Sequence, residues 1–175
     1  MIINVVKKAK NGDKQAFEKL ILYYQIDLYK IAKAYLLVED DINDAIQETI
    51  ISAYQSIKLL TNISKFKSWI IKILINKCNE IYRKKKRENC ISYETINTDK
   101  YLYENSIADS DLEFYNIIKC LNTEERTILI LYYVEGYTPK EIAKILNINS
   151  NTIRSKILRA KNKIKNNSKE IFEYE

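Results

Sequence analysis

The sequence has no histidine, one proline, two glycines and three cysteines among its 175 residues. Without histidine, and with Cys78, Cys90 and Cys120 too far apart to form a CxxC pair, the common zinc sites are excluded. An odd and scattered set of cysteines also argues against a disulfide scaffold and fits a reducing compartment. We therefore expect a cytoplasmic protein that holds no metal ion and no cofactor.

Long apolar runs are missing as well. No stretch of the sequence is apolar over the length that a bilayer-spanning helix requires. In residues 1–13 the positive charges follow the apolar residues, and no small-residue cleavage site is present, so the pattern is not that of a secretory signal. We expect neither a signal peptide nor insertion into a membrane.

The scarcity of glycine and proline leaves little material for the tight turns that join β-strands. Apolar residues instead recur with helical spacing along most of the chain, which predicts an all-α fold. A chain of this length can bury one good core or two small ones. The formal net charge of +6 at pH 7 suggests a polyanionic partner, although charge alone does not identify one.

Residues 138–165 predict two short helices joined by a tight turn. Thr138, Pro139 and Glu141 are typical of a helix start, with a capping hydroxyl, a proline in the first turn and a glutamate that completes a capping box. Asn147 should end that helix, because asparagine tolerates a left-handed backbone. The second helix has an apolar stripe that consists of Ile153, Ile157, Ala160 and Ile164. The opposite face is basic and carries Arg154, Lys156, Arg159, Lys161 and Lys163.

This pair of helices has the pattern of a helix-turn-helix whose second helix enters the major groove of DNA. The alternative is an ordinary helical hairpin with a solvated basic surface. The small Ala143 in the first helix, the position of the turn and the basic second helix occur together, and this combination favours DNA binding.

The first half of the chain predicts three further helices. The first opens at Gly12-Asp13 and keeps its apolar period to Leu37, the second is capped by Asp40 or Asp41, and the third follows a polar loop at 61–64. The second helix carries a polar patch near its start, for which helix capping and solubility are a sufficient explanation. The patch consists of Asn43, Asp44, Gln47 and Glu48.

The third helix is basic along its length, with Glu80 as the only acid among its many lysines and arginines. Trp69, Asn76 and Tyr82 are interleaved with the cations, as in proteins that hold single-stranded or distorted DNA. The alternative for Trp69 is burial in the core, and we expect that outcome.

The helical period disappears between the two halves. From Glu88 to about Asp109 the segment is acidic and lacks apolar spacing, which predicts a flexible linker. We therefore divide the chain into a helical domain at 1–87, a linker at 88–110, a second helical domain at 111–167 and a tail at 168–175. The sequence gives no role to the tail.

Three segments together resemble the extracytoplasmic-function (ECF) group of bacterial RNA polymerase sigma factors. They are DDINDAIQETIISAY, FKSWIIKILINKCNEIYRKKKR and LNTEERTILILYYVEGYTPKEIAKILNINSNTIRSKILRAKNKIK. The resemblance covers almost the whole chain except the linker and the tail. Two departures are Asn147, where the family usually has glycine, and Lys77-Cys78, where small or aliphatic residues are common.

The resemblance implies partners and roles. Core RNA polymerase would be bound through its clamp coiled coil, by Asp44, Gln47 and Glu48, and through its flap, by the second domain. The minus-ten promoter element would be opened by the third helix and the loop before it, in which Asn76 matches the family's asparagine and Lys72, Lys77 and Arg83 would contact phosphates. The minus-thirty-five element would be read by Thr152, Arg154, Ser155, Lys156, Leu158 and Arg159. Arginine would pair with guanine, and Thr152 and Lys161 suit the DNA backbone better. The family also implies an inhibitory anti-sigma factor, often membrane-anchored.

Two other functional classes share parts of this pattern. A dimeric helix-turn-helix regulator that never joins polymerase would share the second domain. An enzyme acting on DNA is disfavoured, because the sequence has no histidine, no glycine-rich phosphate loop and no cysteine pair. Metal chemistry by carboxylates alone stays open, but the clustered acids lie at a helix start, where capping explains them.

Overall fold

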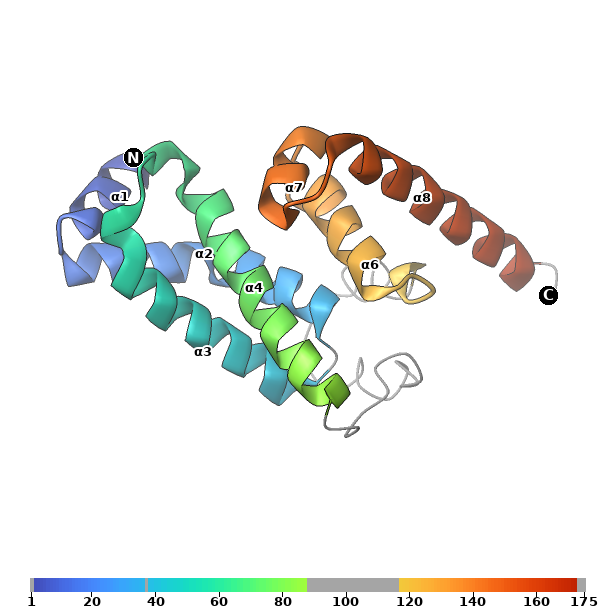
Figure 1. The fold of residues 1–175 in the computed structure, drawn as a ribbon, viewed down its shortest axis with the longest axis horizontal. Coiled ribbons are helices and arrows are strands. Elements are labelled where there is room, and N and C mark those ends of the chain that lie inside the picture. The colour runs from blue at the N-terminus through green and yellow to red at the C-terminus, as the bar shows by residue number, and fades with distance from the viewer. Residues whose placement is uncertain (1, 37, 88–116, 173–175) are drawn as a thin grey trace. The chain divides into compact units, whose positions relative to one another are not determined.

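The computed structural model of the chain describes residues 2–36, 38–87 and 117–172 (Figure 1). All regular secondary structure in these residues is helical, so the predicted all-α fold is confirmed. The chain divides into two compact units, Met1–Lys85 and Lys86–Glu175. The predicted linker lies outside the described residues, as do the first six residues of the predicted second domain, at 111–116.

The first unit is built from four α-helices. Asp13 caps the second of them as predicted, since its carboxylate accepts a hydrogen bond from the Ala16 N–H at 3.0 Å. The helix before it was not predicted, because only a few residues precede Gly12 and their apolar period is short. The elements are α1 (Ile2–Lys10), α2 (Lys14–Tyr35), α3 (Glu39–Ser56), two 3-10 turns (Ile57–Leu59 and Ile63–Lys65) and α4 (Phe66–Arg87).

Helix α4 packs against both α2 and α3. The ring of Tyr24 on α2 contacts Phe66 at the start of α4, with 5.7 Å between centroids, and Tyr35 near the end of α2 donates a hydrogen bond to Asn79. Because residues early in α2 contact the start of α4 and later ones contact its later part, the two helices run in the same direction. The residues that fill the core between the three helices are almost fully buried: Leu20, Leu28, Ile31, Ile42, Ala45, Ile70, Ile71 and Leu74.

Two expectations for this unit need correction. Helix α3 begins at Glu39, and Val38 precedes it without a side-chain cap, so neither Asp40 nor Asp41 caps the helix. Asp41 is buried instead, and its carboxylate lies 2.6 Å from the ammonium of Lys85 on α4. Trp69 is half-buried rather than fully in the core, with its ring against Phe66.

The second unit contains α6 (Thr123–Leu129), which continues as a π-helical turn (Ile130–Val134), α7 (Pro139–Leu146) and α8 (Ser150–Phe172). Gly136 follows the π-helical turn with a positive φ of 72°. The backbone of α8 continues into the segment that we predicted as a tail. The core combines side chains from all of these elements and from residues 117–122, which precede them: Ile118, Leu121, Ile128, Leu129, Ile130, Leu131, Ile142, Ile145, Ile153, Ile157 and Ala160.

The turn between α7 and α8 forms as its sequence predicts. Thr138 and Glu141 make the reciprocal hydrogen bonds of a capping box, and Pro139 occupies the first turn of α7. Asn147 ends α7 in the left-handed region, with φ 56° and ψ 45°. Asn149 then accepts a hydrogen bond from the Asn151 N–H at 2.8 Å as α8 begins. These local bonds fix the direction in which α8 leaves the turn.

Candidate nucleic-acid interface

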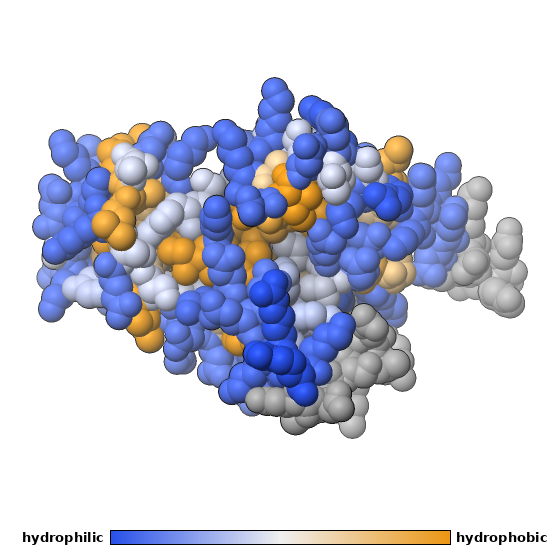
Figure 2. Space-filling model, in the orientation of Figure 1, coloured by the Kyte–Doolittle hydropathy of each residue, from blue (hydrophilic) through white to orange (hydrophobic). Residues whose placement is uncertain are grey.

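Helix α8 presents one apolar and one exposed side. Ile153, Ile157 and Ala160 are buried against the rest of the unit, as their spacing predicts. The opposite side carries Arg154, Ser155, Leu158 and Arg159, all of which are exposed. On the face drawn in Figure 2, hydrophilic residues cover most of the described surface, with smaller hydrophobic areas between them. The exposed side of α8 therefore combines cations, a hydroxyl and one apolar side chain.

The two arginines on this side bond within their own helix. Arg154 donates to the side-chain oxygen of Asn151 at 2.8 Å, and Arg159 donates to the carbonyl of Ser155 at 3.4 Å. Contacts of this kind between exposed groups are weak, because water competes for both partners. Each guanidinium can therefore exchange its contact for a base edge or a phosphate.

Leu158 stands out among the predicted contact residues, because 61% of it is exposed although it is apolar. Thr152 is half-buried at the start of the helix. Lys161 is exposed and lies over the ring of Tyr133, with its nitrogen 5.3 Å from the ring centroid. The Lys161 ammonium donates a hydrogen bond to the Tyr133 side chain, which raises the pKa of Lys161, so the ammonium stays charged at neutral pH.

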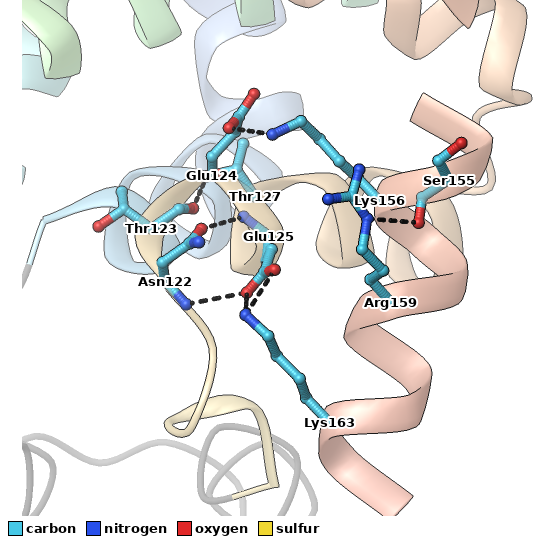
Figure 3. Close-up of polar contacts among 9 residues, drawn as sticks. All are labelled: Asn122, Thr123, Glu124, Glu125, Thr127, Ser155, Lys156, Arg159 and Lys163. Carbon is cyan, nitrogen blue, oxygen red and sulfur yellow. Dashed lines mark hydrogen bonds and ion pairs between the residues drawn. The ribbon is translucent and has the colours of Figure 1, made fainter. Parts of the chain in front are cut away.

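Lys156 differs from the other predicted contact residues. Its ammonium lies 2.6 Å from a carboxylate oxygen of Glu124 on α6. Lys163 makes a similar bridge, because its ammonium lies 2.8 and 2.9 Å from the two carboxylate oxygens of Glu125 (Figure 3). These two lysines face α6, whereas Arg154 and Arg159 do not.

The predicted minus-ten residues lie along α4. Lys72, Asn76 and Arg83 are exposed and follow one another at helical spacing on one side. Lys77 is half-buried, and its ammonium lies 3.3 Å from Glu80 and 3.8 Å from Glu48. A phosphate at Lys77 would therefore have to compete with two carboxylates.

The predicted polymerase-binding patch lies on α3. Asp44, Gln47 and Glu48 are exposed there, and Glu48 is the residue that reaches Lys77 on α4. The structure thus brings the edge of this acidic patch next to the basic side of α4. No group of three or more metal-binding side chains occurs among the described residues. Nor does any described helix have the length and apolar character to span a bilayer.

Sequence reasoning missed the acidic partners of the basic helices. Glu124 and Glu125 lie two and three residues after the N-cap Asn122, and Glu125 completes a capping box with it. That N-x-x-E spacing was a usable signal for the helix start. The pairing with Lys156 and Lys163 had no signal, because it joins residues far apart in the sequence.

Comparisons with known proteins agree with this arrangement. Residues 20–88 match the family model of sigma-70 region 2, and residues 111–164 match that of sigma-70 region 4. The RNA polymerase sigma factor SigV of Bacillus subtilis is 31% identical over 153 residues, which cover 87% of this chain and 91% of that protein. The ECF RNA polymerase sigma-E factor of Haemophilus influenzae is 29% identical over 175 residues, which cover 93% of this chain and 92% of that protein.

Solved structures support the same fold. CnrH, in complex with the cytosolic domain of CnrY, matches with a TM-score of 0.67 at 21% identity, over 93% of this chain and 94% of CnrH. The sigma factor RpoE of Bartonella quintana, in complex with the anti-sigma factor NepR, matches with a TM-score of 0.68 at 23% identity, over 86% of this chain and 94% of RpoE. The family matches over most of the chain, with the 31% identity to SigV over 87% of it, show that the protein belongs to the ECF group of RNA polymerase sigma factors.

Proposed function

We propose that this protein directs core RNA polymerase to promoters that carry a minus-ten and a minus-thirty-five element, and that it opens the DNA at the first of these. The observation that carries the proposal is the exposed polar side of α8, which follows a helix-turn-helix and lies opposite a buried apolar stripe. A sigma factor is not itself a catalyst; it confers promoter recognition on the polymerase that carries it.

In this proposal α8 reads the minus-thirty-five element. Arg154 and Arg159 pair with guanine, the hydroxyl of Ser155 bonds to a base edge, and Leu158 contacts the methyl group of thymine. Thr152 and Lys161 lie toward the edges of this surface and contact phosphates. In this proposal Lys156 does not contact the DNA, because its ammonium already pairs with Glu124.

Helix α4 then holds the opened minus-ten element. Asn76 offers an exposed amide to an unpaired base, and Lys72 and Arg83 neutralise phosphates, with a smaller part for Lys77. Opening follows from differential binding, because a surface that binds unstacked bases better than paired ones shifts the equilibrium by that difference.

The protein partners in the proposal are core polymerase and an inhibitor. Asp44, Gln47 and Glu48 dock on the clamp coiled coil, and the second unit rests on the flap. The exposure of these three α3 side chains supports the first contact. An anti-sigma factor that covers the same surfaces is proposed because RpoE of Bartonella quintana, which has this fold, was solved in complex with the anti-sigma factor NepR. A membrane anchor on that inhibitor is part of the proposal.

Reconstitution tests this function. The full-length protein is mixed with core polymerase, the stoichiometry of the complex is measured by native mass spectrometry, and transcripts from genomic DNA are sequenced with and without the protein. A one-to-one complex and new transcripts that share two upstream elements are expected. A dimer that binds a palindrome and does not associate with core polymerase would identify a regulator instead.

A further inference from the structure

Two cations of α8 are held differently from the rest. Lys156 and Lys163 are seven residues apart, about two helical turns, and therefore lie on the same side of α8. Their partners, Glu124 and Glu125, are adjacent in the first turn of α6. The shortest distances between ammonium and carboxylate are 2.6 and 2.8 Å (Figure 3). Two positions of α8 that are about two turns apart are thus bridged to one end of α6.

The Glu125 carboxylate is fixed by more than its partner lysine. The Glu125 side chain is only 8% exposed, and one of its oxygens also accepts a hydrogen bond from the Asn122 N–H at 3.3 Å. Asn122 in turn accepts a hydrogen bond from the Glu125 N–H at 2.9 Å. If Lys163 moved to a phosphate, the buried carboxylate would lose its cation, which is strongly unfavourable.

The apolar stripe of α8 decides which side of the helix is buried, and Ile153, Ile157 and Ala160 are almost fully covered. The two ion pairs lie on one flank of this stripe and further restrict rotation and shift of α8 relative to α6. The residues proposed to read bases, such as Arg154 and Arg159, are carried on the same rigid helix, so their reach into the groove depends on this restriction.

We propose that Lys156 and Lys163 are positioning residues that lock α8 onto the first turn of α6, and that neither neutralises a promoter phosphate. This inference rests on the function proposed above for α8. It separates the basic residues of the helix into a group that contacts DNA and a pair that orients the helix.

Salt dependence distinguishes the two roles. The affinity of the reconstituted holoenzyme for its promoter is measured over a range of salt concentrations for wild type, Lys156→Gln, Lys163→Gln and the control Lys161→Gln. Each phosphate contact that is lost lowers the slope of log K against log salt by about 0.9. The control should show that loss. Lys156→Gln and Lys163→Gln should keep the wild-type slope, while their discrimination among bases of the upstream element falls.

A charge exchange provides the second readout. Lys156→Glu should weaken promoter selectivity, and adding Glu124→Lys should restore it, because the ion pair reforms in the opposite sense. If Lys156 contacted a phosphate, the exchanged pair would stay defective, since a carboxylate would then face the DNA. Circular dichroism reports whether each variant folds, and if Lys163→Gln does not, the exchanged pair still tests the positioning role of Lys156.

A slope that falls by about 0.9 in Lys156→Gln or Lys163→Gln would overturn the positioning role while leaving the sigma function intact. Failure of the exchanged pair to regain selectivity would also overturn it for Lys156. If the wild-type protein neither joined core polymerase nor bound a promoter with it, the proposed function would fail first.

Discussion

The exposed leucine of α8 gives a quantitative prediction about promoter sequence. Fully burying a leucine side chain is worth ~1.5–3 kcal/mol. Because 61% of Leu158 is exposed, covering that part in a DNA groove is worth about 1–2 kcal/mol. Leu158→Ala should therefore weaken promoter binding by roughly 5- to 30-fold, provided the side chain meets an apolar group. In the major groove that group is the methyl of thymine.

Deoxyuridine makes the prediction specific, because it differs from thymidine only by lacking this methyl group. Each thymine of the upstream element is replaced in turn, and holoenzyme affinity is measured for wild type and for Leu158→Ala. Burying one methyl group is worth ~0.8 kcal/mol, or about 4-fold in affinity. At one position the wild type should lose about this factor on replacement, and the variant should lose almost nothing.

The matched control is Leu59→Ala, which removes a leucine that is 79% exposed but lies in the first unit. That variant should keep the full sensitivity to the thymine methyl. Equal losses for wild type and Leu158→Ala at every thymine would refute the contact. Loss of helical structure in the variant would instead show that the exposed leucine supports the fold.

Three other predictions follow from single positions. Asn147→Ala should speed hydrogen exchange of the α7 and α8 amides by about 5-fold, because alanine in the left-handed conformation is disfavoured by ~1 kcal/mol. Asn147→Gly should leave the exchange rate unchanged, since glycine adopts this conformation freely. Equal exchange in the two variants would contradict this reasoning. Asp44→Arg should weaken binding to core polymerase in a pull-down without unfolding the protein. The control Glu18→Arg, at an exposed position on α2, should leave this binding unchanged. Equal effects of the two variants would contradict the proposed polymerase-binding patch on α3. Burial raises the pKa of Cys78 from 9.0 to about 12, so ionisation favours the unfolded chain and stability should fall as pH rises from 9 toward 12. In Cys78→Ala stability should fall less steeply with pH, and the two slopes should differ by at most roughly tenfold in the unfolding constant per pH unit. Unfolding is followed by the fluorescence of Trp69, the single tryptophan, which lies in the same unit. Parallel curves of stability against pH for wild type and variant would contradict the effect ascribed to Cys78.

Features that depend on near neighbours in the sequence could be predicted. The capping box of Thr138 and Glu141 and the left-handed Asn147 are decided within a few residues, so local rules were sufficient. The buried stripe of α8 follows from the helical period alone. The all-α fold follows from the same period, repeated along the chain.

Features that depend on tertiary contacts could not be predicted from the sequence. Asp41 has the position and chemistry of a helix cap, but the packing of α3 against α4 places it beside Lys85. The start of α3 therefore lies earlier than the acids suggest. Nor does the sequence indicate the π-helical turn at the end of α6, because its residues fit an α-helix equally well.

The basic patches show why charge counts from sequence overstate a nucleic-acid interface. Several lysines of α4 and α8 lie within 3 Å of a carboxylate from another helix: Lys67 with Asp27, Lys85 with Asp41, Lys156 with Glu124 and Lys163 with Glu125. Each such pair contributes little net charge to the surface and joins two helices instead. The salt slope of promoter binding should therefore reflect the exposed cations such as Lys72 and Arg154, and it should be smaller than the number of lysines and arginines on the two helices implies.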